Sequence, residues 1–182
     1  MIPTVRFTIL VDTELPATDM QGNLLLSQER GADRLATAIA ALGYEVSVSE
    51  SPLAAAPPDG WLLYFGADPA EAFDRCGSER EAVRRRLAII DQDRVTAREL
   101  MQELAVPFVV TSSSYSSWLR NSVSYAQVVA PPALARNLGI VLPPEDLAEP
   151  FVRFSVVGIP LPEGIARSCL AVTRRQGPSS GD

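Results

Sequence analysis

Residues 91–111, DQDRVTARELMQELAVPFVVT, predict a helix that leads directly into a buried strand. Apolar side chains recur near the 3.6-residue period from Val95 to Leu104, so one side of the helix should lie on a sheet. Asp93 suits the cap position at the start of the helix. Pro107 cannot continue a helix and directs the chain into the apolar strand Phe108–Val110.

Strands and helices also alternate before this stretch, and the apolar run 61–65 suits a strand covered on both faces. We therefore predict a Rossmann-like α/β fold, in which a parallel sheet carries helices on both faces and a small α+β lobe follows. The predicted strands are 5–11, 44–49, 61–65, 107–111, 127–130, 151–158 and 165–173. The predicted helices are 24–42, one or two within 69–90, 93–106, 118–124, 133–138 and one that begins near 145.

The alternating pattern ends near Ser112, where a polar stretch begins. We accordingly divide the chain into a Rossmann-like α/β domain at 1–112, a partial α+β lobe at 113–175 and a disordered tail at 176–182.

The composition narrows the class of protein. With 182 residues, 47% of them hydrophobic, the chain can bury one substantial core. Its net charge of -6 argues against nucleic acid as a partner, and its apolar runs fall short of the roughly 20 residues that span a membrane. We expect a cytoplasmic protein in which Cys76 and Cys169 are structural thiols.

All 16 basic residues are arginine, and the chain has no lysine and no histidine. This excludes imidazole bases, Schiff-base lysines and the lysine of a P-loop. Arginine-for-lysine drift in a GC-rich genome explains the composition equally well. Any chemistry must use carboxylates, hydroxyls, backbone amides and guanidinium groups.

Two stretches, residues 91–111 and FVRFSVVGIPLPEGIAR at 151–167, resemble the front part of an ATP-grasp ligase. The resemblance implies bound ATP and Mg²⁺, a relationship to carboxylate-amine ligases, and a peptide or protein substrate or a partner subunit. An Asp-Arg pair that opens a helix is typical of that family, and the basic residue touches nucleotide phosphate. The residues that inherit nucleotide contacts are Arg94, Thr111, Ser112, Arg153 and Arg167.

The chain departs from the ATP-grasp pattern at the phosphate site. A lysine normally ends the strand placed here at 127–130, where this chain has Ala130. The glycine-rich loop and the later magnesium ligands have no counterpart. Because phosphoryl transfer needs cations to neutralise the reacting phosphates, we assign no catalytic residue and expect a binding component without independent catalysis, a pseudoenzyme.

Each candidate residue also has a structural explanation. Arg94 could pair with Asp91 or Glu99, and Arg153 could lie on the open face of a sheet. The carboxylates of Asp12, Glu14 and Asp19 could hold Mg²⁺ after the first strand, although we favour a solvated acidic loop and assign no metal ligand. The arginines at 84–86 are interpreted as a solvated helix face, with Glu79 and Glu81 close by.

Two alternatives remain open. The strand ending in DTELP, the helix GADRLATAIAALG and the later stretch YAQVVAPPALARNLGI resemble the N-terminal acceptor domain of a GT-B glycosyltransferase. The other alternative is a purely structural interaction module on the same scaffold.

Overall fold

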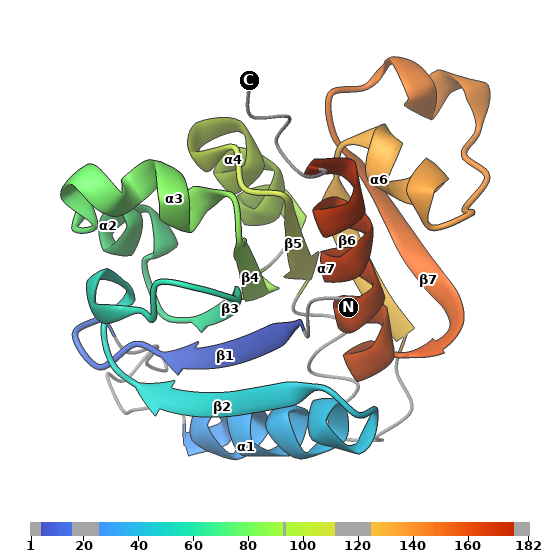
Figure 1. Cartoon of the computed structure of the whole chain (residues 1–182). Helices are drawn as coiled ribbons and strands as arrows, with labels where there is room; N and C mark the ends of the chain where they lie inside the picture. The colour runs from blue at the N-terminus through green and yellow to red at the C-terminus, as the bar shows by residue number, and fades with distance from the viewer. Residues whose placement is uncertain (1–4, 16–25, 93, 112–124, 177–182) are drawn as a thin grey trace, which may run out of the picture.

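The structure is a computed structural model that describes residues 5–15, 26–92, 94–111 and 125–176, with the side chains at 26–30, 91, 92, 94 and 95 excepted. The described strands form one sheet in the order β2-β1-β3-β4-β5-β6-β7 (Figure 1). They are β1 (Arg6–Val11), β2 (Glu45–Glu50), β3 (Trp61–Phe65), β4 (Leu87–Gln92), β5 (Phe108–Thr111), β6 (Tyr125–Ala130) and β7 (Val152–Pro160). Strands β1 to β5 are parallel, and β6 and β7 extend the sheet in antiparallel fashion.

Helices cover both faces of the sheet, as the sequence predicted. Helices α1 and α7 pack on one face, whereas α2, α3 and α4 pack on the other (Figure 1). The helices are α1 (Leu26–Ala41), α2 (Pro69–Asp74), α3 (Arg80–Arg84), α4 (Arg94–Leu104), α6 (Pro132–Asn137) and α7 (Leu161–Gln176). Short 3₁₀ turns are η1 (Leu53–Ala55), η2 (Gly77–Glu79) and η3 (Pro144–Ala148).

The central strand β3 shows why the sheet needs two layers of helices. All five of its residues are buried, and they alternate between the two cores. Trp61, Leu63 and Phe65 face α1 and α7, whereas Leu62 and Tyr64 face α2 and α4. A run of this kind can be stabilised only where apolar side chains meet it from both sides. The predicted Rossmann-like α/β class is confirmed.

The deciding stretch forms the predicted helix and strand. Leu100, Met101 and Leu104 of α4 are buried against the sheet, and β5 follows directly. The helix ends at Leu104, and the next residue, Ala105, has a left-handed φ of 51°. The carbonyl of Ala105 accepts a hydrogen bond from Arg84 Nη1 at 3.0 Å, so α3 also holds this corner. The predicted cap Asp93 lies outside the described residues.

One predicted strand is wrong. Residues 165–173, predicted as a strand, lie within helix α7. Leu161, Ile165 and Cys169 are buried and lie four residues apart, which is a helical spacing. In a short apolar segment taken alone, this spacing is not enough to distinguish a helix from a strand. The range 69–90, predicted to contain one or two helices, holds α2 and α3, and strand β4, which was not predicted, begins at Leu87. The predicted helix at 118–124 lies outside the described residues.

The second half of the chain joins the same sheet as the first. Val110 of β5 is aligned with Val128 of β6, and Ala130 of β6 is aligned with Val152 of β7. The described part of the predicted lobe, residues 125–175, is therefore hydrogen-bonded to the parallel strands through β6. It also contributes to the same hydrophobic core, which α1 and α7 cover.

Candidate functional site

The start of α4 lies beside the carboxyl end of β5, because α4 follows directly after β4. Gln92 of β4 is aligned with Thr111 of β5, and α4 begins two residues later at Arg94. Unpaired amides at the start of a helix favour anions. The predicted phosphate contact Arg94 thus has its backbone at the predicted edge, while its side chain and Ser112 lie outside what the structure describes.

Two of the predicted contacts, Thr111 and Arg153, meet through a residue that the sequence prediction missed. Thr111 is fully buried, and its Oγ1 donates to the Gln127 carbonyl at 3.4 Å. Arg153 is exposed, and its Nη1 donates to Gln127 Oε1 at 3.5 Å. Both hydrogen bonds are long. We call Thr111, Gln127 and Arg153 the polar row. The signal available for Gln127 was side-chain alternation along the predicted strand 127–130. Val128 and Ala130 face one core, so alternation places the polar side chain of Gln127 on the opposite face of the strand.

Arg167 does not belong with the polar row. It lies on α7, exposed to solvent, and its Nη2 pairs with Glu163 Oε1 at 2.8 Å. Helix α7 packs on the face of β7 that carries Val152 and Phe154, whereas Arg153 lies on the opposite face. The sheet therefore separates Arg167 from Arg153.

The carboxyl end of β1, where doubly wound sheets often bind ligands, is occupied by the protein's own hydrogen bonds. Asp12 is buried, and one of its oxygens accepts from the amides of Glu14 and Leu15, both at 2.9 Å. Its other oxygen accepts from the Tyr64 hydroxyl at 2.6 Å. Burial, together with this bond to Asp12, raises the pKa of Tyr64 far above its usual value. We call Asp12 and Tyr64 the buried pair.

The carboxylates considered for Mg²⁺ do not form a metal site in the described structure. Asp12 is used by the buried pair, Glu14 pairs with Arg75 at 2.9 Å, and Asp19 lies outside the described residues. Among the residues that the structure describes, no group of three histidine, cysteine or acidic side chains could hold a metal ion.

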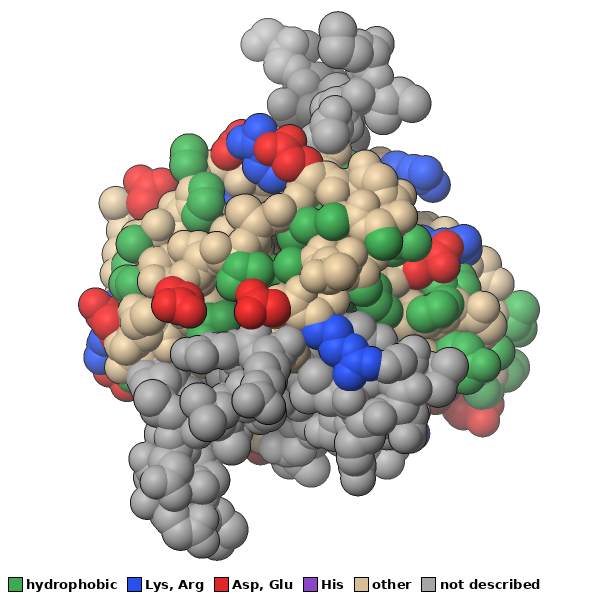
Figure 2. All heavy atoms as spheres, turned by 90° about the horizontal axis from the view of Figure 1, so that it is seen from below, with side chains coloured by type: hydrophobic (Ala, Val, Ile, Leu, Met, Phe, Trp, Pro, Cys, Tyr) green, Lys and Arg blue, Asp and Glu red, His purple; other side chains and the backbone are tan. Residues whose placement is uncertain are grey.

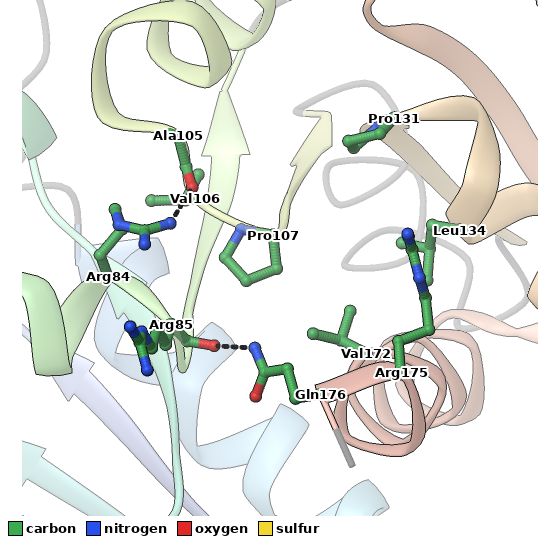
Figure 3. Close-up of a pocket in the computed structure, with 10 residues that line it drawn as sticks. All are labelled: Arg84, Arg85, Ala105, Val106, Pro107, Pro131, Leu134, Val172, Arg175 and Gln176. Atoms are coloured by element: carbon green, nitrogen blue, oxygen red, sulfur yellow. Dashed lines mark hydrogen bonds between the residues drawn. The ribbon is translucent and has the colours of Figure 1, made fainter. Parts of the chain in front are cut away.

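A pocket opens at the opposite, amino-terminal edge of the sheet (Figure 3). Its volume is about 630 Å³, and it lies before β4 and β5 and after β6, beside the last turn of α7. The lining residues are Arg84, Arg85, Ala105, Val106, Pro107, Pro131, Leu134, Val172, Arg175 and Gln176. We call this hollow the amino-edge pocket.

The arginines of the amino-edge pocket differ in how they are paired. Arg84 bonds Glu81 and the Ala105 carbonyl, and Arg85 Nε lies 3.5 Å from Glu81 Oε1. The hydrogen bond from Arg84, with a contribution from Arg85, lowers the pKa of Glu81 to about 2. Arg175 makes no hydrogen bond or ion pair with any described residue, and it lines the same pocket as Leu134 (Figure 3). The prediction that the arginines at 84–86 form a solvated helix face missed the contribution of Arg175, which is distant in sequence.

The face on the side of α1 shows no comparable grouping of charge among the described residues (Figure 2). On the side of α1, acidic side chains are scattered among apolar and uncharged groups, and the described arginines in view lie apart from one another (Figure 2). No described helix is long and apolar enough to cross a membrane.

Comparison with known proteins leaves the fold and the geometry as the only guides to function. No protein-family model matches the chain, and neither curated proteins nor solved structures give a match.

Proposed function

We propose that the chain is an ATP-grasp-related component that binds nucleotide phosphate at the carboxyl edge of β4 and β5 without catalysing ligation itself. The observation that supports this best is the position of exposed Arg153, which is linked through Gln127 to Thr111 on the sheet face that α4 covers. The start of α4 at Arg94 lies beside the same strand end. A guanidinium group and the start of a helix together suit a phosphate group.

The roles within this site follow from burial. Arg153 is exposed and can reach a ligand directly, whereas Thr111 is buried and supports Gln127. At the end of β6, Ala130 is fully buried where the resemblance calls for a phosphate lysine. Because no described cluster fits a metal, Mg²⁺ would enter as a complex with ATP, and we assign no protein ligand to it.

This proposal carries two expectations with it. A nucleotide-binding component fits the cytoplasmic location that the composition favours. Without its own phosphate lysine, such a component would serve a peptide or protein substrate or a partner subunit that supplies the reacting groups.

Calorimetric titration with ATP, with and without Mg²⁺, tests the proposal. Arg153→Ala should weaken binding about tenfold, the value expected for loss of a hydrogen bond between charged groups. Arg94→Ala should also weaken it. Arg167→Ala is the matched control, since it removes the same charge from the opposite face of the sheet. Equal losses in Arg153→Ala and Arg167→Ala would show a general charge effect and contradict the site.

The same titration separates the alternatives. Selective binding of a sugar nucleotide in place of ATP would favour the GT-B reading. Absence of binding by either nucleotide would favour an interaction module, and co-purification from the native cell would then be the informative experiment.

A further inference from the structure

The amino-edge pocket has the size and lining of a small-molecule site. Its volume of about 630 Å³ lies within the range of roughly 300–1,000 Å³ that is usual for such sites. Buried Val106 and Leu134 contribute apolar surface, with Pro107 and Pro131 beside them. An apolar group of a ligand that binds here would be removed from water, which is favourable.

The charge of the pocket contrasts with the charge of the whole chain. Among the described residues three arginines line it and no acidic residue does, although the protein carries a net charge of -6. Glu81, which lies outside the lining, pairs with Arg84 and Arg85. Arg175 remains without a partner among the described residues. The pocket therefore presents unneutralised positive charge above an apolar surface.

A hydrogen bond fixes the two walls of the pocket relative to each other. Gln176 Nε2, at the end of α7, donates to the Arg85 carbonyl at 3.2 Å, and Figure 3 shows this bond between the walls. Arg175 is the preceding residue, and its side chain lies across the pocket from Arg84 and Arg85 (Figure 3). The Arg85 guanidinium is turned away from the pocket in Figure 3, so Arg175 is left as the arginine of this hollow without a described partner.

We propose that the amino-edge pocket binds a small organic anion with an apolar chain, whose head group is held by Arg175. A guanidinium fork matches a carboxylate or a phosphate. The apolar chain would lie against Val106 and Val172. Thr111 of the polar row and the start of α4 lie at the opposite sheet edge, so this site does not depend on nucleotide binding there.

The test is a methyl NMR titration of the full chain with octanoate, octyl phosphate and octan-1-ol. We expect octanoate or octyl phosphate to shift the methyl resonances of Val106 and Val172, and the comparison of these two anions identifies the preferred head group. Octan-1-ol has the same chain without the charge, and it should bind at least fivefold more weakly if charge-assisted hydrogen bonds contribute.

Adjacent arginines provide a matched pair of variants. Arg175→Gln should weaken binding of the anion about fivefold to tenfold. Arg174→Gln removes the same charge one residue away, from a separate hollow that contains Arg167, and should change binding less than about twofold. Both residues are exposed, so both variants should fold, which circular dichroism can verify.

Three results would overturn the proposal. They are equal binding of octan-1-ol and the anions, equal losses in Arg174→Gln and Arg175→Gln, and no shift of the Val106 and Val172 methyl groups with any probe. Glu81→Gln provides an independent check, because it releases Arg84 and Arg85 and should tighten binding of the anion about twofold.

Discussion

The two edges of the parallel sheet use their polar groups in opposite ways. At the carboxyl edge, between β1 and β3, the buried pair satisfies Asp12 with two amides and a phenol. At the amino edge, before β4 and β5, arginines surround an open pocket, and Arg175 has no described partner. Between β1 and β3, the edge that usually binds ligands is occupied by the protein's own hydrogen bonds, whereas the amino edge before β4 and β5 holds an open pocket.

The difference shows that the carboxyl edge is not one uniform site. In the order β2-β1-β3, the chain continues on one side of β1 to form β2 and on the other side to form β3. The topological switch point therefore lies between the parallel strands β1 and β3, where a ligand crevice is normally expected. In this chain that position is occupied by the buried pair, and the nucleotide site that we propose lies further along the sheet, at the ends of β4 and β5. Breaking the buried pair should therefore affect folding, whereas changes at the amino edge should affect binding.

Gly66→Ala should give the largest effect, because it breaks the buried pair sterically. A Cβ at this position would lie 2.3 Å from the Tyr64 hydroxyl and 2.6 Å from its ring. Overpacking and loss of a hydrogen bond to a charged group should together cost about 3 kcal/mol. Urea unfolding measures the loss. The double variant Gly66→Ala with Tyr64→Phe should lose less than the sum of the single variants, and simple additivity would contradict the steric explanation.

Asp12→Asn should have a smaller effect on the same structure. The amide oxygen can keep the bonds from Glu14 and Leu15, but the charge that strengthens the bond from Tyr64 is lost. We expect a loss of about 2 kcal/mol in the free energy of unfolding. Asp12→Ala should be worse, since it leaves the buried phenol without an acceptor. If Asp12→Asn gained stability and bound Mg²⁺ less well, the carboxylate would belong to a metal site instead.

The buried pair should also limit stability at high pH. The pKa of Tyr64 is raised above its usual value of 10.0 by burial and by Asp12. Above that pH, Tyr64 ionises in the unfolded chain but stays neutral in the folded chain, so stability falls as pH rises. The slope from this residue is about 1.4 kcal/mol per pH unit. Urea unfolding between pH 9.5 and 11.5 should show a shallower loss in Tyr64→Phe. Equal slopes for the two proteins would contradict the assignment.

The sequence was sufficient for the elements whose patterns are local. The continuous apolar run at 61–65 predicts a strand buried on both faces, and the 3.6-residue period within 91–111 predicts a helix with one buried side. Both predictions are confirmed within the described residues. Residues 165–173 were mispredicted because the helical period becomes clear only when Leu161 is included. The elements that pack against a short segment in the folded protein determine whether it forms a helix or a strand, and the segment's own sequence does not contain this information.

Neither site could be assembled from sequence alone. The polar row joins β5, β6 and β7, and the register that brings Gln127 between Thr111 and Arg153 is set by strand pairing. The amino-edge pocket joins residues near 85, 106 and 175, which are separate in sequence. Arg167 illustrates the converse case, because its position in the motif gave no indication that the sheet would separate it from Arg153.

Ala105→Gly should give the smallest effect, and it tests whether the corner of the amino-edge pocket is held under backbone strain. A left-handed φ of 51° costs alanine about 1–2 kcal/mol, whereas glycine adopts it freely and loses about 0.5–1 kcal/mol in chain entropy. We expect a net gain of about 0.5 kcal/mol by urea unfolding. Ala40→Gly, at an exposed helical position in α1, is the matched control and should lose stability. The carbonyl that Arg84 binds is unchanged by the substitution, so octanoate binding should be preserved. A loss of stability in Ala105→Gly as large as that in Ala40→Gly would show that the alanine methyl group contributes packing that outweighs the strain.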